Sequence, residues 1–167
     1  MSSIVVPLTE AHFPRLYEVL DEVARERRYL ATLEAPPREQ TYAFFRGSLN
    51  QGNPHLVALL DGEVVGWCDV LPVFGQARRH VGMLGIGLVR RARGQGLGRA
   101  LLEAAIAGAW AKGLTRIELT VRADNHKARE LYERMGFEHE GRQRGSFCVD
   151  GQSVDSHAMA LLRGGPR

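Results

Sequence analysis

The residues from Arg90 to Arg99, RRARGQGLGR, combine four arginines with three alternating glycines. Gly94, Gly96 and Gly98 let the backbone turn tightly and bring its N–H groups close to a ligand. A helix predicted directly behind them adds unpaired N–H groups and the positive end of its dipole. This pattern predicts a binding site for a phosphate or pyrophosphate. The alternative is a tight strand-to-helix turn without a ligand, whose arginines are simply solvated.

The spacing of the glycines excludes two common phosphate-binding loops. A P-loop ends in Gly-Lys-Ser/Thr, because a lysine must reach the β- and γ-phosphates and a hydroxyl must reach magnesium. Here Gly98 is followed by Arg99 and Ala100. The dinucleotide-binding pattern G-x-G-x-x-G does not arise in any register of the three glycines. The loop therefore belongs to neither class.

The elements on either side of this loop are predicted to position it. The uncharged apolar run 81–89 is long enough for a buried strand and too short for a membrane span. After the loop, apolar residues recur every four positions from Leu97 to Ala109, as on one face of a helix. Gly113 is expected to end that helix. Residues 116–122 then alternate between apolar and polar, which predicts a strand parallel to 81–89.

The rest of the chain predicts a mixed α/β (α+β) fold. The dipeptide Asp-Gly occurs at 61–62 and 150–151 between predicted strands, which is a strong hairpin signal. We expect one domain over residues 1–163 and a frayed tail over 164–167. The predicted strands are 4–8, 55–60, 63–70, 80–89, 116–122, 138–149 and 152–162. The first predicted helix is capped by Thr9 and has an apolar face from Phe13 to Val23. The other predicted helices are 38–49, 97–112 and 127–135.

Composition and charge exclude several classes of protein. The 167 residues are 44% hydrophobic and 25% charged, as in a soluble globular protein, and the net charge is +3. No stretch approaches the roughly 20 apolar residues of a transmembrane helix and no signal-peptide pattern is present, so we expect a cytoplasmic protein without a membrane partner. The arginines form small separate clusters, which argues against a nucleic-acid partner. Two cysteines and six histidines lack metal-ligand spacing, so no metal is expected.

Two motifs together resemble the GNAT superfamily of N-acetyltransferases. Residues 93–98, RGQGLG, fit Q/R-x-x-G-x-G/A, and residues 125–137, NHKARELYERMGF, fit N-x-x-A-x-x-L-Y-x-x-x-G-F. The resemblance covers nearly the whole chain, and residues 140–159 are similar to the branch that acts on free L-amino acids and, more distantly, on ribosomal-protein N-termini. It implies a mixed, mostly antiparallel sheet of about seven strands, splayed after the central strand and flanked by about four helices. Family members are often homodimers.

The resemblance also implies acetyl-CoA as co-substrate. In the family the backbone N–H groups of the glycine loop hold the pyrophosphate, and the pantetheine arm pairs with the central strand. Gly85 and Gly87 predict a β-bulge in that strand, and freed N–H groups near Leu88 would act as an oxyanion hole. Asn125 is predicted to cap a helix, to contact the coenzyme, or both. The residues implied to bind the coenzyme are Ile86, Leu88, Val89, Arg93, Gly94, Gln95, Gly96, Leu97, Gly98, Arg99, Asn125, Ala128 and Tyr132.

Tyr132 falls on the family tyrosine that hydrogen-bonds the coenzyme sulfur. The leaving thiolate belongs to a thiol of pKa about 8.5–9, and a phenol of pKa about 10 can donate a hydrogen bond to it as it departs. The alternative is a core tyrosine in an amphipathic helix, beside Leu131 and Phe137. The motif around Tyr132 favours the catalytic role.

An amine acceptor also requires a base, because it is mostly protonated at neutral pH. The run 81–89 contains no carboxylate, although several family members place their base there. Thr120 occupies a position that is glutamate in N-terminal ribosomal-protein acetyltransferases. Glu118, two residues earlier on the same strand face, is the first candidate. Asp69, His80 and Asp155 follow it.

We therefore expect acetyl transfer by direct attack of a small primary amine, such as an L-amino acid or a similar compound. A protein N-terminus or an antibiotic is the second choice of acceptor. A non-catalytic acyl-CoA-binding module and a basic RNA-associated protein are the competing classes. The candidates for an apolar acceptor pocket are Tyr29, Leu33, Phe45 and Trp67, which could instead be core residues. Arg78 or Arg79 could hold a carboxylate of the acceptor, or could instead be solvated at the surface.

Overall fold

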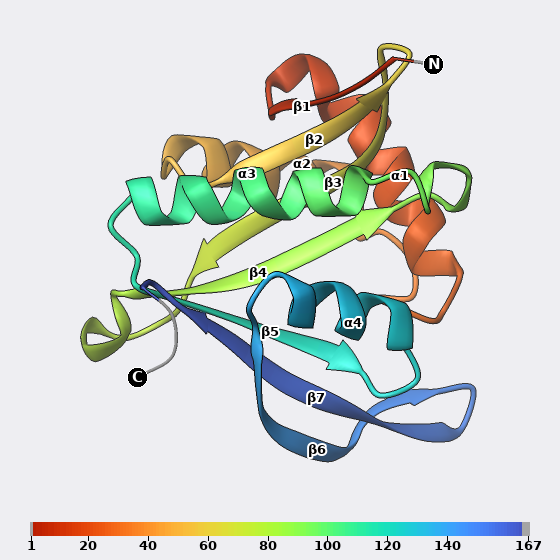
Figure 1. Cartoon of the computed structure of the whole chain (residues 1–167). Coiled ribbons are helices and arrows are strands. Elements are labelled where there is room, and N and C mark those ends of the chain that lie inside the picture. Colours follow the sequence, from red (N-terminus) through yellow and green to blue (C-terminus); the bar gives the residue numbers. More distant parts are fainter. Residues whose placement is uncertain (1, 165–167) are drawn as a thin grey trace.

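The computed structural model of the chain describes residues 2–164, so most of the predicted tail lies outside the described residues. Seven strands form one sheet flanked by four α-helices (Figure 1). The strands are β1 (Ser3–Pro7), β2 (His55–Leu60), β3 (Glu63–Pro72), β4 (Val81–Leu88), β5 (Arg116–Arg122), β6 (Glu138–Val149) and β7 (Gln152–Leu162). The helices are α1 (Phe13–Arg25), α2 (Arg38–Asn50), α3 (Leu97–Ala111) and α4 (His126–Arg134). None of the helices within residues 2–164 is long and apolar enough to cross a membrane.

The sheet has the order β1-β2-β3-β4-β5-β7-β6 and is antiparallel except between β4 and β5. The parallel pairing confirms the prediction for these two strands. It covers only three residue pairs, from Val81 opposite Arg116 to Met83 opposite Glu118. Beyond them β4 and β5 diverge (Figure 1), which confirms the predicted splay.

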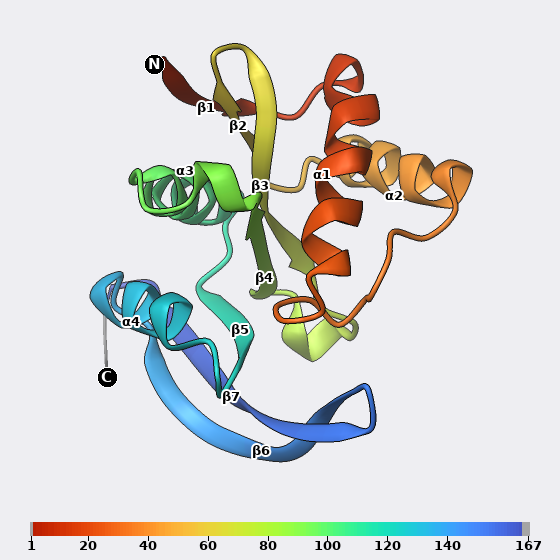
Figure 2. The same ribbon diagram turned by 90° about the vertical axis from the view of Figure 1, so that its right-hand side faces the viewer.

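Helices cover both faces of the sheet in the half that contains β1 to β4 (Figure 2). α3 packs on one face, and α1 and α2 lie on the other. The periodicity explains this packing, because the apolar stripes of α1 and α3 turn inward. The buried residues of these two helices are Phe13, Leu16, Val19, Val23 and Ala24, and Leu97, Leu101, Leu102, Ala105, Ile106 and Ala109.

The two Asp-Gly turns have the geometry that their sequence predicts. Asp61 and Gly62 have φ values of 51° and 81°, and Asp150 and Gly151 have 52° and 76°. Positive φ at both central residues is the type I′ geometry that matches the twist of paired strands. Both predicted hairpins, β2–β3 and β6–β7, are therefore confirmed.

The predicted bulge at Gly85 and Gly87 is wrong. β4 pairs with β3 in an unbroken register from Gly82 to Leu88, with Gly87 opposite Trp67. A side chain at Gly87 would place its Cβ 2.3 Å from the Trp67 ring. Gly87 is therefore needed because the indole crosses the neighbouring strand at this point, and the splay arises without a bulge in β4.

Candidate active site

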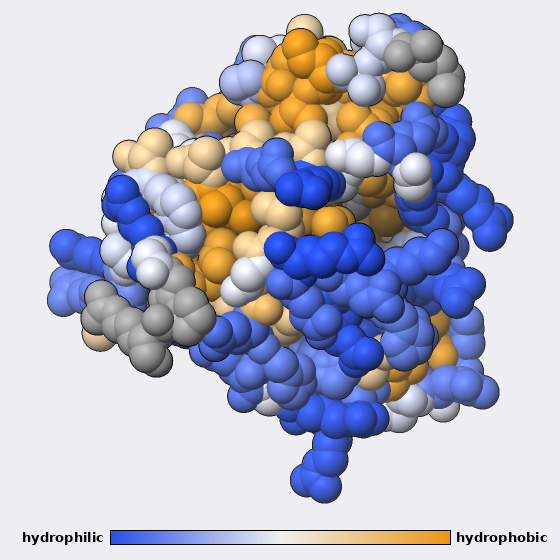
Figure 3. All heavy atoms as spheres, viewed as in Figure 1, coloured by the Kyte–Doolittle hydropathy of each residue, from blue (hydrophilic) through white to orange (hydrophobic). Residues whose placement is uncertain are grey.

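A cleft of about 670 Å³ lies between the C-terminal half of β4, the start of α3 and α4. Hydrophilic side chains of α3 and α4 border apolar atoms that lie between them (Figure 3). The predicted residues that line the cleft are Ile86, Leu88, Arg93, Gly94, Gly96, Gly98, Arg99, Asn125, Ala128 and Tyr132. The structure thus brings together seven residues from two sequence motifs about 30 positions apart, with Ile86, Leu88 and Arg99 beside them.

The loop before α3 presents a run of free backbone amides. Gly94 and Gly96 have φ values of 74° and 83°, in the left-handed region that favours glycine. Hydrogen bonding to backbone acceptors stops at Arg93, whose N–H donates to Arg90, and resumes at Ala100, whose N–H donates to Gly96. Within residues 2–164, the amides of 94–99 have no backbone acceptor. Unpaired amides at a helix N-terminus favour an anion, as the sequence predicts.

The side chain of Arg93 holds the end of β4 in place and does not reach into the loop. Its Nε donates to the Leu88 carbonyl at 3.0 Å, and its Nη1 donates to Glu26 at the end of α1 at 2.9 Å. The guanidinium carbon also lies 4.7 Å from the centre of the Tyr29 ring. Arg93 therefore joins β4, α1 and the α1–α2 loop at one wall of the cleft.

Three of the residues predicted to bind the coenzyme have side chains elsewhere. Val89 is fully buried and its N–H donates to the Val65 carbonyl, so Val89 faces away from the cleft. The Gln95 amide donates back to the Arg91 carbonyl at 2.9 Å, and the Leu97 side chain lies in the core. A contact between Val89 and the coenzyme stays a prediction, and the pairing of Val89 with Val65 does not favour it. Gln95 and Leu97 can contribute only their backbone amides.

The cleft also contains residues that sequence reasoning missed. They are Val23, Gly87, Lys127, Glu130, Leu131 and Arg134. Lys127, Leu131 and Arg134 are spaced four and three residues apart, as on one helix face, so helical periodicity within the second motif could have found them. Tyr29, which was predicted for an acceptor pocket, also lines the cleft. Val23 could not be found, because it reads as an ordinary core residue of α1.

The splay leaves backbone N–H groups of β4 without a neighbouring strand. The Val89 N–H donates to Val65 of β3 at 2.9 Å. Because donors alternate along an antiparallel pair, the N–H groups of Gly85 and Gly87 also face β3, and those of Ile86 and Leu88 face the opposite edge. The Leu88 carbonyl at that edge accepts from Arg93, which agrees with this alternation. Ile86 and Leu88 are therefore candidate oxyanion donors at the cleft.

The Tyr132 side chain lines the cleft from α4 and is only 7% exposed. Its ring lies 5.9 Å from that of Phe137. Burial, with a smaller contribution from Cys68, raises the pKa of Tyr132 far above its usual value. The phenol therefore stays protonated and can donate a hydrogen bond at any working pH. Burial also raises the pKa of the Cys68 thiol, which argues against a cysteine nucleophile.

Arginines hold two of the predicted bases. Partial burial acts to raise the pKa of Glu118, but hydrogen bonds from Arg116 (2.9 Å) and Arg78 (2.6 Å) and their charges lower it overall. The Gly145 N–H and Arg142 lower the pKa of Asp155. Neither Glu118 nor the other candidate Asp69 lines the cleft, so the role of base stays a prediction for both, and the contacts of Glu118 favour a structural role.

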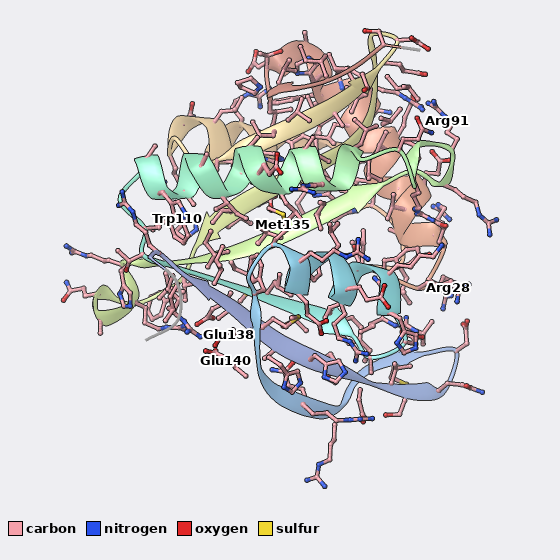
Figure 4. The ribbon with its side chains drawn as sticks, in the orientation of Figure 1. Arg28, Arg91, Trp110, Met135, Glu138 and Glu140 are labelled. Carbon is pink, nitrogen blue, oxygen red and sulfur yellow. The ribbon has the colours of Figure 1, made fainter. Side chains whose placement is uncertain are left out.

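Other polar groups and predicted pocket residues make contacts within the fold. Arg91, beside the loop that follows β4 (Figure 4), pairs with Glu63 at 3.0 Å. Phe45 packs against Phe13 with ring centroids 5.3 Å apart, so Phe45 belongs to the core. In the described part of the chain, no cluster of three or more His, Cys, Asp or Glu side chains could hold a metal ion.

Comparison with known proteins agrees with this geometry. Residues 14–137 match the family model described as Acetyltransferase (GNAT) family. The chain is 32% identical to the L-amino acid N-acetyltransferase AaaT of Escherichia coli (strain K12) over 98% of this chain and 100% of that protein. A GNAT-family acetyltransferase from Streptococcus pneumoniae superimposes with a TM-score of 0.88 at 27% identity, covering 96% of this chain and 99% of that one. The chain therefore belongs to the GNAT family and is an N-acetyltransferase.

More distant solved structures share the fold. A ribosomal-protein-alanine N-acetyltransferase from Brucella melitensis superimposes with a TM-score of 0.90 at 24% identity, over 95% of this chain and 99% of that chain. An N-acetyltransferase from Staphylococcus aureus Mu50 has a TM-score of 0.92 at 18% identity, over 97% and 99% of the two chains. The predicted fold class is confirmed.

Proposed function

We propose that the protein transfers the acetyl group of acetyl-CoA to the primary amine of a small molecule, an L-amino acid or a similar compound. The observation that carries this proposal is the cleft in which the free amides of 94–99, the open edge of β4 and Tyr132 meet. The acceptor class is supported by the full-length similarity to a protein named as an L-amino acid N-acetyltransferase.

Each part of the cleft has a role in this proposal. The amides of 94–99 bind the pyrophosphate of acetyl-CoA, and Lys127 adds positive charge at the same opening, where Arg134 is paired with Glu130 at 3.6 Å. The N–H groups of Ile86 and Leu88 stabilise the oxyanion that forms on the thioester carbonyl. Tyr132 donates a hydrogen bond to the leaving thiolate.

Asn125 has two roles in the same proposal. Its side chain caps α4 by accepting from the Ala128 N–H at 3.3 Å, and both residues line the cleft beside the coenzyme. Cys148 is exposed on β6 and Cys68 is buried, so we propose direct attack without a covalent enzyme intermediate. A cytoplasmic location and a homodimer stay predictions.

The proposal is tested by calorimetry with acetyl-CoA and by thiol release with a panel of acceptors. The panel contains L-amino acids, a peptide with an N-terminal alanine and an aminoglycoside. We expect binding of acetyl-CoA and the fastest release with an L-amino acid. Faster release with the peptide or the aminoglycoside would favour the alternative acceptors. Binding without turnover of any acceptor would favour a non-catalytic acyl-CoA-binding module, and absence of binding would overturn the proposal entirely.

Tyr132→Phe is expected to lower kcat by about 100-fold, because the thiolate would depart without a hydrogen-bond donor. The KM for acetyl-CoA should change by no more than a few-fold, since the glycine loop stays intact. Steady-state kinetics measures both. Tyr42→Phe is a matched control, because the Tyr42 hydroxyl lies on α2 and contacts Arg38 at 2.9 Å. An unchanged kcat in Tyr132→Phe would assign Tyr132 to the core.

A further inference from the structure

We propose that Asp69 is the general base that removes a proton from the acceptor amine across Gly85 on β4. This inference rests on the proposed function and adds the group that the glycine loop and Tyr132 do not supply. It replaces Glu118, whose carboxylate is held by Arg78 and Arg116.

Asp69 differs from every other carboxylate that the structure describes in residues 2–164. It is 6% exposed and is the only buried acidic residue in that part of the chain. No lysine or arginine among the described residues forms an ion pair with it. Burial raises the pKa of Asp69 to about 7, although backbone N–H groups, including that of Gly85, act in the opposite direction. A carboxyl group with this pKa can accept a proton at neutral pH.

The register of β3 and β4 places Asp69 over an open part of β4. Asp69 lies opposite Gly85, and Trp67 lies opposite Gly87. A Cβ on Gly85 would be 3.0 Å from Asp69 Oδ1, so the carboxylate extends over the place that a side chain would fill. Met83, the next residue on this face of β4, is 39% exposed. Gly85 itself is partly exposed, so an acceptor that reaches this face of β4 would lie against the Asp69 carboxylate.

This position is within reach of the predicted reaction. The N–H groups of Ile86 and Leu88 face the opposite edge of β4 and define where the thioester carbonyl would bind. The Asp69 carboxylate extends over Gly85, so about one strand spacing, roughly 4.8 Å, separates it from a carbonyl bound at the far edge of β4. A proton can cross this distance directly from the amine or through one water molecule.

A buried histidine next to Asp69 suits a carboxyl group that changes its protonation state. His55 on β2 pairs in register with Asp69, and its Nε2 is buried without a hydrogen-bond partner, 3.8 Å from Asp69 Oδ2. The other ring nitrogen lies 3.1 Å from Ser48 Oγ on α2. The separation of 3.8 Å is too long for a hydrogen bond. After a small shift of either side chain, neutral imidazole would accept from the protonated carboxyl or donate to the ionised one, depending on its tautomer. The other titratable neighbour is the buried thiol of Cys68, the next residue along the strand.

The proposed step conserves protons and electron pairs. The acceptor ammonium gives one proton to the Asp69 carboxylate, and the neutral amine attacks the thioester carbonyl carbon to form the C–N bond. The C–S bond then breaks. The leaving thiolate takes up the second proton lost by the nitrogen, and Asp69 returns the first to solvent. The products are the N-acetylated acceptor, the free thiol and one proton.

The first test is the pH dependence of kcat at saturating amine. In the wild-type protein kcat should rise with pH and level off above about pH 7. Asp69→Asn should lower kcat by about 100-fold or more at pH 7.5 and remove the plateau, because proton removal then depends on solvent. Acetyl-CoA affinity, measured by calorimetry, should stay the same. Asp61→Asn, at the turn of the same hairpin, is the matched control and should keep the wild-type profile.

Two kinetic outcomes would overturn the assignment. One is an Asp69→Asn variant with the wild-type kcat and profile. The other is a plateau that disappears in Glu118→Gln and persists in Asp69→Asn, which would return the role of base to Glu118.

The second test does not depend on turnover. The chain has two tryptophans, so Trp110→Phe leaves Trp67 as the only indole, on the same face as Asp69. Its fluorescence should titrate with a midpoint near pH 7, and Asp69→Asn in this background should remove the transition. Normal turnover without that fluorescence transition would overturn the assignment of Asp69 as the base and would leave the proposed function standing. Binding of acetyl-CoA without turnover of any amine would overturn the proposed function, and with it the base.

Discussion

Gly98→Glu is expected to lower the affinity for acetyl-CoA by about 100-fold without unfolding the protein. Gly98 lies in the first turn of α3, and a Cβ there would be in ordinary contact with Leu131 (3.4 Å) and Leu88 (3.6 Å). The fold can therefore accept a side chain. A glutamate in the first turn even favours the helix, by about 0.3–1 kcal/mol. Its carboxylate would, however, occupy the place of the pyrophosphate and repel it, and the expected 100-fold loss of affinity corresponds to about 2.7 kcal/mol.

The matched control for this experiment is Gly98→Ala. The methyl group adds bulk without charge, so affinity should stay within a few-fold of the wild type. Calorimetry gives the affinity, and thermal unfolding shows that both variants are folded. Wild-type binding by Gly98→Glu would place the anion away from the start of α3.

Asp69→Asn is expected to stabilise the folded protein by up to about 4 kcal/mol at pH 8 and to leave it almost unchanged at pH 4. Burial raises the pKa of Asp69 to about 7 from 3.8, and each pKa unit corresponds to about 1.4 kcal/mol. Above pH 7 the folded wild-type protein holds an ionised buried carboxylate, whereas an amide carries no charge. A loss of activity together with a gain in stability is typical of a functional group.

The pH dependence of stability should also change, because Asp69 lies beside His55. Burial lowers the pKa of His55 to about 4 from 6.5, so His55 alone destabilises the fold as pH falls from 6.5 to 4. Asp69 acts in the opposite sense, because its raised pKa favours the folded state as pH falls from 7 to 4. The two effects nearly cancel in the wild type. Asp69→Asn should therefore lose about 3 kcal/mol of stability between pH 6.5 and 4.

Urea unfolding followed by circular dichroism at several pH values measures both effects. Asp61→Asn serves again as control, since Asp61 is exposed at the β2–β3 turn. An Asp69→Asn variant that is less stable than the wild type at pH 8 would contradict the expected desolvation of the carboxylate.

Local patterns predicted most of the elements of this fold. The bounds of β5, β6 and β7 agree with the predicted strands, because alternation and the Asp-Gly turn act over a few residues. The helix predicted from Thr9 begins only at Phe13, after a short 3-10 turn in which His12 Nδ1 accepts the Thr9 N–H at 3.0 Å. Hydrogen bonds between side chains and backbone at the start of a helix cannot be predicted from the periodicity of apolar residues.

The candidate site was less predictable, because its side chains find partners far away in the sequence. Arg93 reads as a phosphate ligand beside three glycines, but it binds Glu26, 67 residues earlier. A glycine within a strand, such as Gly87, indicates either a β-bulge or the close approach of another group to the backbone. Only the position of the Trp67 ring on the neighbouring strand decides between these two explanations. The sequence does not distinguish Asp69 from the other candidate bases. In the structure Asp69 is buried, whereas Glu118 forms ion pairs with two arginines.

The short junction of β4 and β5 has a consequence for cooperativity. Three residue pairs connect the portion that contains β1 to β4 with the portion that contains β5 to β7. Because so few ladder bonds couple the two portions, we expect them to open as separate cooperative units in native-state exchange. Ile86 and Leu88 belong to one unit and Tyr132 to the other. The catalytic arrangement would therefore be lost by partial opening, well before the chain unfolds globally.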